Sequence, residues 1–175
     1  MRNGDWMQTY TGRQYWPLDP RAEDVDIIDI AHALSMLCRY TGHCKDFYSV
    51  AEHCVYVSRC VPEEHALQGL MHDAQEAYCN DIARPLKRFI LNYEEIEGRN
   101  WRVIAEKFGL PFDLHPSVKY ADISVLLAEA AVLLGPAPAP WSFGDIKAAD
   151  IEIRASPPAV AESMFLARFK ELTSW

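Results

Sequence analysis

The sequence predicts an all-α fold in a single domain of 175 residues. Apolar residues recur at intervals of three and four along most of the chain, which is the period of an amphipathic helix. Capping residues and prolines stand where these periodic segments begin, and glycines stand where they end. No segment shows the strict alternation that is typical of a half-buried strand, and half of the residues are apolar, enough for one substantial core.

The N-terminal part of the chain predicts an arm followed by a helix. Residues 1–20 combine glycine, proline and aromatic side chains without periodicity, which favours an ordered arm or loop over disorder. Asp24 or Asp26 can cap the first helix, because a short carboxylate side chain accepts hydrogen bonds from the free N–H groups of a first turn. The apolar pattern carries this helix to Tyr40, and Gly42 then stops it.

Two further helices are expected before residue 80. Ser49 and Glu52 have the spacing of a capping box, in which the two residues satisfy each other's backbone donors. They predict a helix over about 50–60. Pro62 suits the first turn of the next helix, which the apolar pattern extends to about Cys79.

The second half of the chain predicts three more helices. An apolar pattern ends at Gly109, which can close its helix in the left-handed conformation. Pro116 opens another helix, whose inward residues are expected to be Val118, Ala121, Val125, Ala128 and Val132. Within residues 135–157, the proline-rich run from Gly135 to Trp141 predicts a stiff, extended connection, and Ser156 with Pro157 can then cap a final amphipathic helix.

Composition excludes several classes of function. Acidic residues outnumber basic ones by 25 to 17, which disfavours a general nucleic-acid-binding surface. No signal segment and no run of roughly 18 apolar residues is present, so we expect a cytoplasmic protein without membrane contact. The five cysteines include no C-x-x-C pair, which favours reduced thiols over a disulfide framework or a zinc ribbon.

The residues with the clearest chemistry lie between Leu70 and Asp81. On a helix, His72 and Glu76 share a face and Asp73 lies about 100° around the axis, so all three can approach one ion. Ionised carboxylates are rarely buried unless they are paired or bound to metal. Two other predicted helices supply His53 and Asp122. With His72 and Asp73 they make a set of two histidines and two carboxylates. Such a set suits a divalent first-row metal with positions left open for water and substrate.

These four residues resemble the signature of the HD-domain phosphohydrolases, an all-helical, metal-dependent family. The similarity covers residues from about 25 to 130 and is closest to the small bacterial and phage branch that contains the 5'-deoxynucleotidases. It rests on the segments Cys38-Arg39-Tyr40-x-Gly42, Tyr48-Ser-Val-Ala-Glu-His53, His72-Asp-Ala-x-Glu76-Ala-Tyr-x-x-Asp81 and Pro85-Leu-Lys87. The N-terminal Tyr15-Trp-Pro-Leu-Asp-Pro20 is most similar to the phage dATP triphosphohydrolases. Cys54 departs from the pattern, because the bacterial deoxynucleotidases have serine there.

The resemblance implies a role for each matching residue. His53, His72, Asp73 and Asp122 would hold the metal, which could be zinc, cobalt, manganese, iron or magnesium. Glu76 and Asp81 would activate water or protonate the leaving oxygen. Arg39 would contact phosphate, and Lys87 and Lys119 would add positive charge for it. For His43, a phosphate contact and a plain surface position are equally consistent with the sequence. The base would stack on Trp16 in a pocket completed by Leu18 and Pro85; without the resemblance, Trp16 reads as a hydrophobic anchor for the arm.

The function implied in this way is hydrolysis of dATP to deoxyadenosine and triphosphate, by a homo-oligomer that would act in the host cytoplasm if it is phage-encoded. One alternative is a 5'-deoxynucleotidase that acts on monophosphates. A second is a catalytically silent HD module that binds a nucleotide as a regulator. Room and positive charge for two further phosphates would distinguish the first two, and product release would distinguish both from the third.

Overall fold

The computed structural model describes residues 2–175, and almost all of its regular structure is helical, so the predicted all-α class is confirmed. None of the described helices is both long and apolar enough to cross a lipid bilayer. The N-terminal arm carries a small antiparallel hairpin, β1 (Met7–Gln8) and β2 (Gln14–Tyr15). Short 3-10 turns lie at Ala22–Asp24, Arg39–Gly42 and Glu63–His65. The helices are α1 (Ile27–Met36), α2 (Val50–Cys60), α3 (Ala66–Met71), α4 (Glu76–Cys79), α5 (Arg84–Lys87), α6 (Tyr93–Phe108), α7 (Pro116–Leu133) and α8 (Pro158–Leu172).

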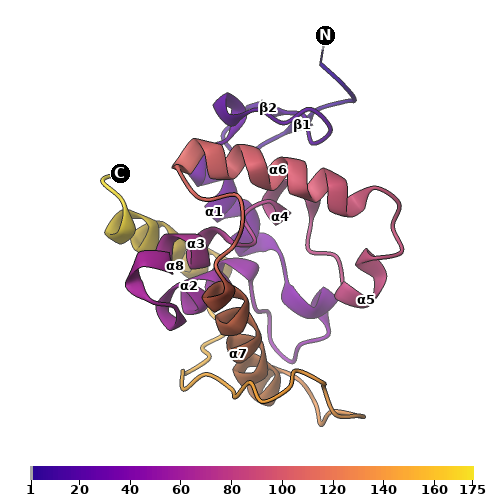
Figure 1. Cartoon of the computed structure of the whole chain (residues 1–175), viewed down its shortest axis with the longest axis vertical. Helices are drawn as coiled ribbons and strands as arrows, with labels where there is room; N and C mark the ends of the chain where they lie inside the picture. Colours follow the sequence, from indigo (N-terminus) through magenta and orange to yellow (C-terminus); the bar gives the residue numbers. More distant parts are fainter. Residues whose placement is uncertain (1) are drawn as a thin grey trace.

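Helix α2 is the centre of the fold. It packs against α1, α3, α7 and α8, and every side chain from Val50 to Ser58 is buried. In Figure 1, α6 crosses the molecule above α1 and α2, α7 lies below them, and α8 runs out to the left toward the C-terminus. A side chain on α2 is therefore enclosed by protein on all sides, and a polar one there needs a partner.

The hydrophobic core has two parts, one on each side of α2. The first joins α1, α3, α8 and the arm to one face of α2, and it includes Tyr15, Ile30, Leu34, Leu70 and Phe165. The second joins α7 to the other face and includes Tyr48, Tyr56, Val57, Val118 and Val125. Because each fully buried large apolar side chain contributes about 1.5–3 kcal/mol, these two sets hold α2 between its neighbours.

The first helix begins where predicted but ends earlier. The side chain of Asp26 accepts a hydrogen bond from the second backbone N–H of α1, so Asp26 is the cap. The helix ends at Met36, and the prediction that it continues to Tyr40 is wrong. The chain becomes extended beyond Met36 because Cys38 pairs as an antiparallel bridge with Ser49, in the segment that enters α2.

The helix predicted over 62–79 is interrupted in the functional stretch. Helix α3 ends at Met71 and α4 begins at Glu76. Between them, the N–H of Ala74 donates to the carbonyl of Met71, and the N–H of Glu76 donates to that of Asp73, both at 2.9 Å. These bonds span three residues rather than four, so the turn is tighter than an α-helix. The prediction of one continuous helix is therefore wrong.

The predicted capping box is half correct. The Ser49 hydroxyl accepts a hydrogen bond from the N–H of Glu52 (3.1 Å), as expected. The buried Glu52 carboxylate does not return to Ser49; it accepts from the N–H of Ser156 (2.6 Å) and from the hydroxyl of Tyr56 (3.1 Å). The prediction that Ser156 caps the last helix is wrong, because Pro157 stands directly before α8 and none of the described side chains caps the helix. Glu52 thus ties the segment before α8 to α2.

The signals in the second half of the chain are mostly confirmed. Gly109 closes α6 with φ +66°, the left-handed conformation that glycine adopts without steric cost. Pro116 lies in the first turn of α7, and the connection after α7 forms neither helix nor strand. The inward prediction for Val132 is wrong, since 51% of it is exposed and Leu133 takes the buried position at this end of the helix.

Candidate metal centre

His53 lies in the first turn of α2 and is fully buried. Its Nδ1 atom is 2.6 Å from Oε1 of Glu129. Because an ionised carboxylate can only accept, Nδ1 carries a proton, so the lone pair of the neutral form of the ring lies on Nε2. Nε2 is 3.1 Å from Oδ1 of Asp122, yet this buried atom has no well-aligned hydrogen-bond partner among the described residues. His53 therefore presents a free ligand atom toward Asp122.

His72, in the tight turn after α3, is oriented in the same way. Its Nδ1 donates to the backbone carbonyl of Gly69 at 2.8 Å, since a carbonyl can only accept. Its Nε2 lies 3.2 Å from Oδ2 of Asp73 and is likewise buried without a hydrogen-bond partner in residues 2–175. The rings of His53 and His72 are 5.3 Å apart between centroids. Two buried Nε2 atoms thus face the same space.

The carboxylates of Asp73 and Asp122 complete the set. Ligand atoms of His53, His72 and Asp122 all lie within 4.8 Å of one another, and Oδ2 of Asp73 is 3.9 Å from Nε2 of His53. The histidines are enclosed, whereas the side chains of Asp73 and Asp122 are 20% and 36% exposed. The structure therefore brings all four predicted ligands together, and their donor atoms fit a divalent metal with an open side toward solvent.

Glu129 on α7 contacts both His53 and Arg39 on the buried side of the ligand set. The sequence did not predict this role of Glu129. Its buried carboxylate accepts from the Tyr48 hydroxyl (2.8 Å) and the Tyr40 hydroxyl (2.7 Å), and it pairs with His53 and with Nε of Arg39 (3.2 Å). An outer partner of this kind fixes the orientation and tautomer of a metal-binding histidine. One signal was available: Glu129 follows Asp122 by two helical turns within an otherwise apolar stretch.

The charges of the site stabilise one another. Burial opposes the charged form of His72, but Asp73 outweighs it and raises the pKa of His72 well above its ordinary value. Burial and Arg39 lower the pKa of His53, while Glu129 and Asp122 raise it, with a net increase. Burial would raise the pKa values of Asp73 and Glu129, yet the neighbouring positive charges hold both well below their usual range. The carboxylates of the centre are therefore ionised.

Arg39 is buried rather than solvated, with only 9% of it exposed. Besides its contact with Glu129, its guanidinium lies 3.9 Å from Oδ2 of Asp73. Burial would lower the pKa of Arg39, but Glu129 raises it, so the positive charge is secure. Arg39 thus stands beside the ligand set and is no isolated surface charge.

Glu76 stands at the start of α4, three residues after Asp73. It is 7% exposed, and its Oε2 atom is buried without a hydrogen-bond partner in the described chain. Burial first, and then the charges of Asp73 and Asp81, raise the pKa of Glu76 well above its ordinary value. Burial likewise raises the pKa of the partly buried Asp81. These two carboxyl groups, which lie near the candidate ligands but outside the set, are able to hold or accept a proton.

Two relatives match this chain over nearly its full length. The uncharacterized protein YfdR of Escherichia coli K12 is 39% identical over 178 aligned residues, which cover 96% of each chain. This chain belongs to the YfdR family. A second, uncharacterized protein from Rhodobacter capsulatus is 32% identical over 182 aligned residues, 93% of each chain. No protein-family model matches the chain.

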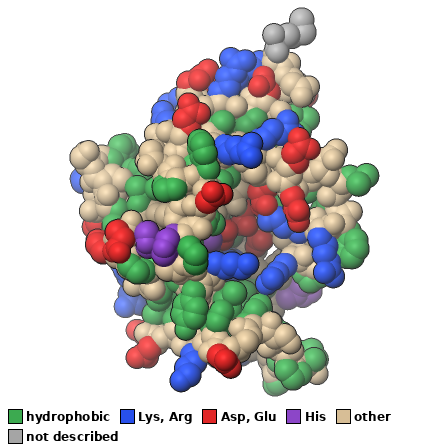
Figure 2. Space-filling view, viewed as in Figure 1, with side chains coloured by type: hydrophobic (Ala, Val, Ile, Leu, Met, Phe, Trp, Pro, Cys, Tyr) green, Lys and Arg blue, Asp and Glu red, His purple; other side chains and the backbone are tan. Residues whose placement is uncertain are grey.

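In this member of the YfdR family, the three residues predicted to assist Arg39 in binding phosphate lie in different surroundings. The Lys87 ammonium on α5 is 2.6 Å from Oε1 of Glu97 on α6, so it is already paired. Lys119 is exposed on α7, one turn before Asp122, and His43 is exposed directly after the 3-10 turn that begins at Arg39. On the face shown in Figure 2, acidic side chains lie recessed near the middle with Lys and Arg side chains around them.

The three residues predicted to hold the base lie on separate segments. The arm that carries Trp16 and Leu18 packs along α6, whereas Pro85 is exposed on α5 (Figure 1). The guanidinium of Arg2 lies 4.1 Å above the Trp16 ring, and the Leu18 carbonyl accepts from Arg99 of α6 at 3.3 Å. The contacts of Trp16 and Leu18 therefore run to the arm and α6, and the base pocket stays a prediction.

Cys54, which follows His53 on α2, lies beside the candidate ligands. Its sulfur, His72 and Asp73 form a second group of ligand atoms within 4.8 Å of one another. Burial raises the pKa of Cys54 to about 11, although His72 acts in the opposite direction. Since only the thiolate is a good ligand, the neutral thiol of Cys54 acts as a small buried hydrophobe.

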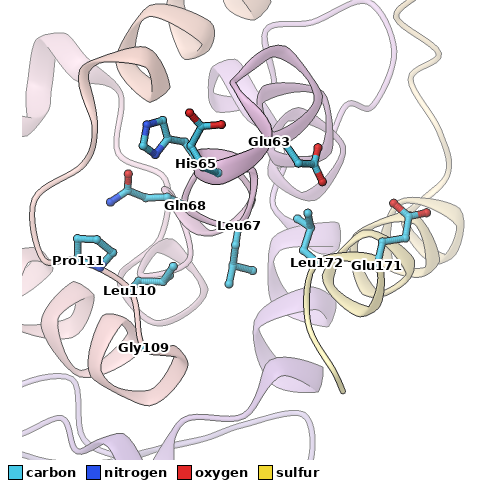
Figure 3. A pocket seen from close by; sticks show the side chains of 10 residues that line it. Glu63, His65, Leu67, Gln68, Gly109, Leu110, Pro111, Glu171 and Leu172 are labelled. Atoms are coloured by element: carbon cyan, nitrogen blue, oxygen red, sulfur yellow. The ribbon is translucent and has the colours of Figure 1, made fainter.

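A cavity of about 430 Å³ lies away from the ligand set, between α3, the end of α6 and the end of α8 (Figure 3). Glu63, Glu64 and Glu171 are among its lining residues. Three carboxylates make this cavity unfavourable for an anionic nucleotide. The chemistry of the molecule is therefore assigned to the histidine and aspartate cluster, not to this cavity.

Proposed function

We propose that this chain is a metal-dependent phosphohydrolase of the HD-domain type, which hydrolyses dATP to deoxyadenosine and triphosphate. One observation carries the proposal. Two buried histidines, each oriented by an acceptor at Nδ1, aim unpaired Nε2 atoms at two carboxylates. A buried nitrogen without a partner is costly, so a site that leaves two of them facing acidic groups favours a bound cation. The relatives share the chain's length but carry names that state no activity.

Each residue of the site has a part in the proposed reaction. A divalent ion held by His53, His72, Asp73 and Asp122 would supply Lewis acidity at the reacting phosphoryl group. Glu76 and Asp81 accept a proton from the attacking water or return one to the leaving oxygen. Arg39, which lies beside Asp73, provides N–H donors that suit phosphate oxygens.

A substrate panel tests the proposal directly. The purified chain is incubated with all deoxynucleoside triphosphates, deoxynucleoside monophosphates and ribonucleoside triphosphates, each with zinc, cobalt, manganese and magnesium, and products are separated by chromatography. Release of triphosphate from dATP supports the proposal. Turnover of monophosphates alone would support a 5'-deoxynucleotidase, and absence of products with tight nucleotide binding would support a silent module.

The predicted homo-oligomer is checked on the same preparations by light scattering after size exclusion. Large apolar side chains are exposed on the arm, at Trp6 and Tyr10, and after α5, at Phe89 and Leu91. These side chains are available for subunit contacts, because exposed apolar surface gains free energy when it is covered.

Addition of the bound metal is expected to raise the melting temperature. Free metal at a hundred times its Kd stabilises the folded state by about 2.7 kcal/mol, which corresponds to roughly 5–10 °C for a chain of this size. Asp73→Asn should lose this increase, because it removes a charged ligand. The matched control is Asp150→Asn, at an exposed position outside the site. Equal increases in Asp73→Asn and the wild type would exclude Asp73 from the ligand set.

Arg39→Lys is expected to reduce kcat/KM for the preferred nucleotide by roughly 10- to 100-fold, since a hydrogen bond to a charged group contributes about 1.5–3 kcal/mol. Lysine keeps the charge but not the planar fork that contacts Glu129 and faces the site. Steady-state kinetics are compared with Arg88→Lys, an exposed position on the segment after α5. Wild-type kinetics in Arg39→Lys would remove Arg39 from substrate binding and leave it a structural role.

A further inference from the structure

Two cysteines outside the ligand set lie in contact. The sulfur atoms of Cys38 and Cys44 are 3.5 Å apart, although the residues are six positions apart in the sequence and both are half-buried. The other cysteines are placed differently: Cys54 is enclosed in α2, Cys60 is exposed at the end of α2, and Cys79 ends α4. Cys38 and Cys44 are therefore a pair of neighbouring free thiols.

An unusual turn produces this contact. Tyr40, Thr41 and Gly42 all have positive φ angles, of 56°, 53° and 77°, and the chain reverses within these residues. Positive φ is uncommon for residues other than glycine, so two in succession require support from the surrounding structure. The Tyr40 hydroxyl bound to Glu129 supplies part of that support.

Both ends of the turn are anchored. On one side, Cys38 forms a backbone bridge with Ser49. On the other, the N–H of Lys45 donates to the carbonyl of Leu133 at the end of α7 (2.9 Å). The two thiols are thus held near one another by main-chain pairing, independently of any contact between the sulfur atoms.

We infer that Cys38 and Cys44 form a reversible intramolecular disulfide by exchange with a low-molecular-weight disulfide. The thiolate of Cys44 attacks the oxidant, which forms a mixed disulfide and releases one small thiolate. The thiolate of Cys38 then attacks the sulfur of Cys44, closes the ring and releases the second. Two electrons pass to the oxidant, and the two cysteine protons end on the two released thiols. The sulfur atoms must approach by about 1.5 Å to reach bonding distance.

The bond would lock the turn that carries Arg39 and Tyr40, both of which contact Glu129. Its formation does not depend on the proposed reaction, since it concerns only thiol chemistry and the fold. The closed loop is short, so the expected stabilisation is modest: a rise in melting temperature of about 5 °C on oxidation.

The test compares the full chain after incubation with oxidised glutathione and after incubation with dithiothreitol. Because burial and Cys38 raise the pKa of Cys44, the exchange is run at about pH 8.5 to populate thiolate. Remaining thiols are alkylated under denaturing conditions. Trypsin then cleaves after Arg39 and Lys45, so Cys38 and Cys44 fall on different peptides, residues 22–39 and 40–45. These two peptides remain joined only if the disulfide has formed.

We expect the joined peptides, loss of two of the five alkylatable thiols, and the rise in melting temperature, all reversed by dithiothreitol. Cys60→Ser should behave like the wild type, whereas Cys44→Ser and Cys38→Ser should each abolish the joined pair. The oxidised and reduced wild type differ in no residue, so the comparison holds even if one variant folds poorly. A glutathione adduct without ring closure, a crosslink to Cys54, Cys60 or Cys79, or five thiols unchanged would each overturn the inference.

Discussion

Glu76→Gln is expected to lower kcat by about 10²- to 10⁴-fold, the range typical of a general acid or base, while metal content stays at the wild-type level. Glutamine keeps the shape of the side chain but cannot take or give the proton. Glu76 is close enough to the ligands for Asp73 to influence its pKa, yet it belongs to neither group of ligand atoms that the structure brings together. Loss of the proton carrier should therefore separate turnover from metal binding.

The measurement combines single-turnover kinetics on the preferred nucleotide with elemental analysis of each preparation. Asp73→Asn provides the contrast, because it should lose metal and activity together. Glu106→Gln, on the exposed face of α6, is the control for a change of charge alone. Should Glu76→Gln and Asp73→Asn lose metal equally, Glu76 is a ligand and not a proton carrier.

Glu129→Gln is expected to destabilise the folded chain by about 3–5 kcal/mol, because it leaves the buried guanidinium of Arg39 without its charged partner. For a chain of this length the melting temperature should fall by roughly 6–20 °C. Metal affinity should also fall by about 10- to 100-fold, since the orientation of His53 depends on the same carboxylate.

Two comparisons separate these effects. The thermal shift is measured in chelator, where loss of metal-linked stability cannot contribute. Tyr48→Phe removes only one hydrogen bond to Glu129 and keeps every charge, so its cost should be near 1 kcal/mol. Glu152→Gln, with 83% of its side chain exposed, is the surface control. A Glu129→Gln protein as stable as Glu152→Gln would show that Arg39 does not need its partner.

Local signals in the sequence determined most of the helices. Asp26 and Ser49 accept hydrogen bonds from N–H groups two and three residues ahead, and the single N–H of Gly109 donates to the carbonyls three and four residues behind it. Interactions of such short range can be predicted from the order of residues alone. The candidate ligands were also predicted from the sequence, since His72 and Asp73 are consecutive and the resemblance to the HD-domain signature adds His53 and Asp122.

Only the tertiary structure shows which distant residues hold the candidate ligands in place. Glu129 is 76 residues from His53 and 90 residues from Arg39, and Glu52 is 104 residues from Ser156. Local propensity contains no information about such pairs, because they form only after helices from distant segments have packed. The same cause explains the early end of α1: Cys38 leaves the helical path to pair with Ser49 across a turn. The sequence by itself therefore predicted the candidate ligand set, and packing around α2 decided how the nitrogen and oxygen atoms of these side chains are oriented.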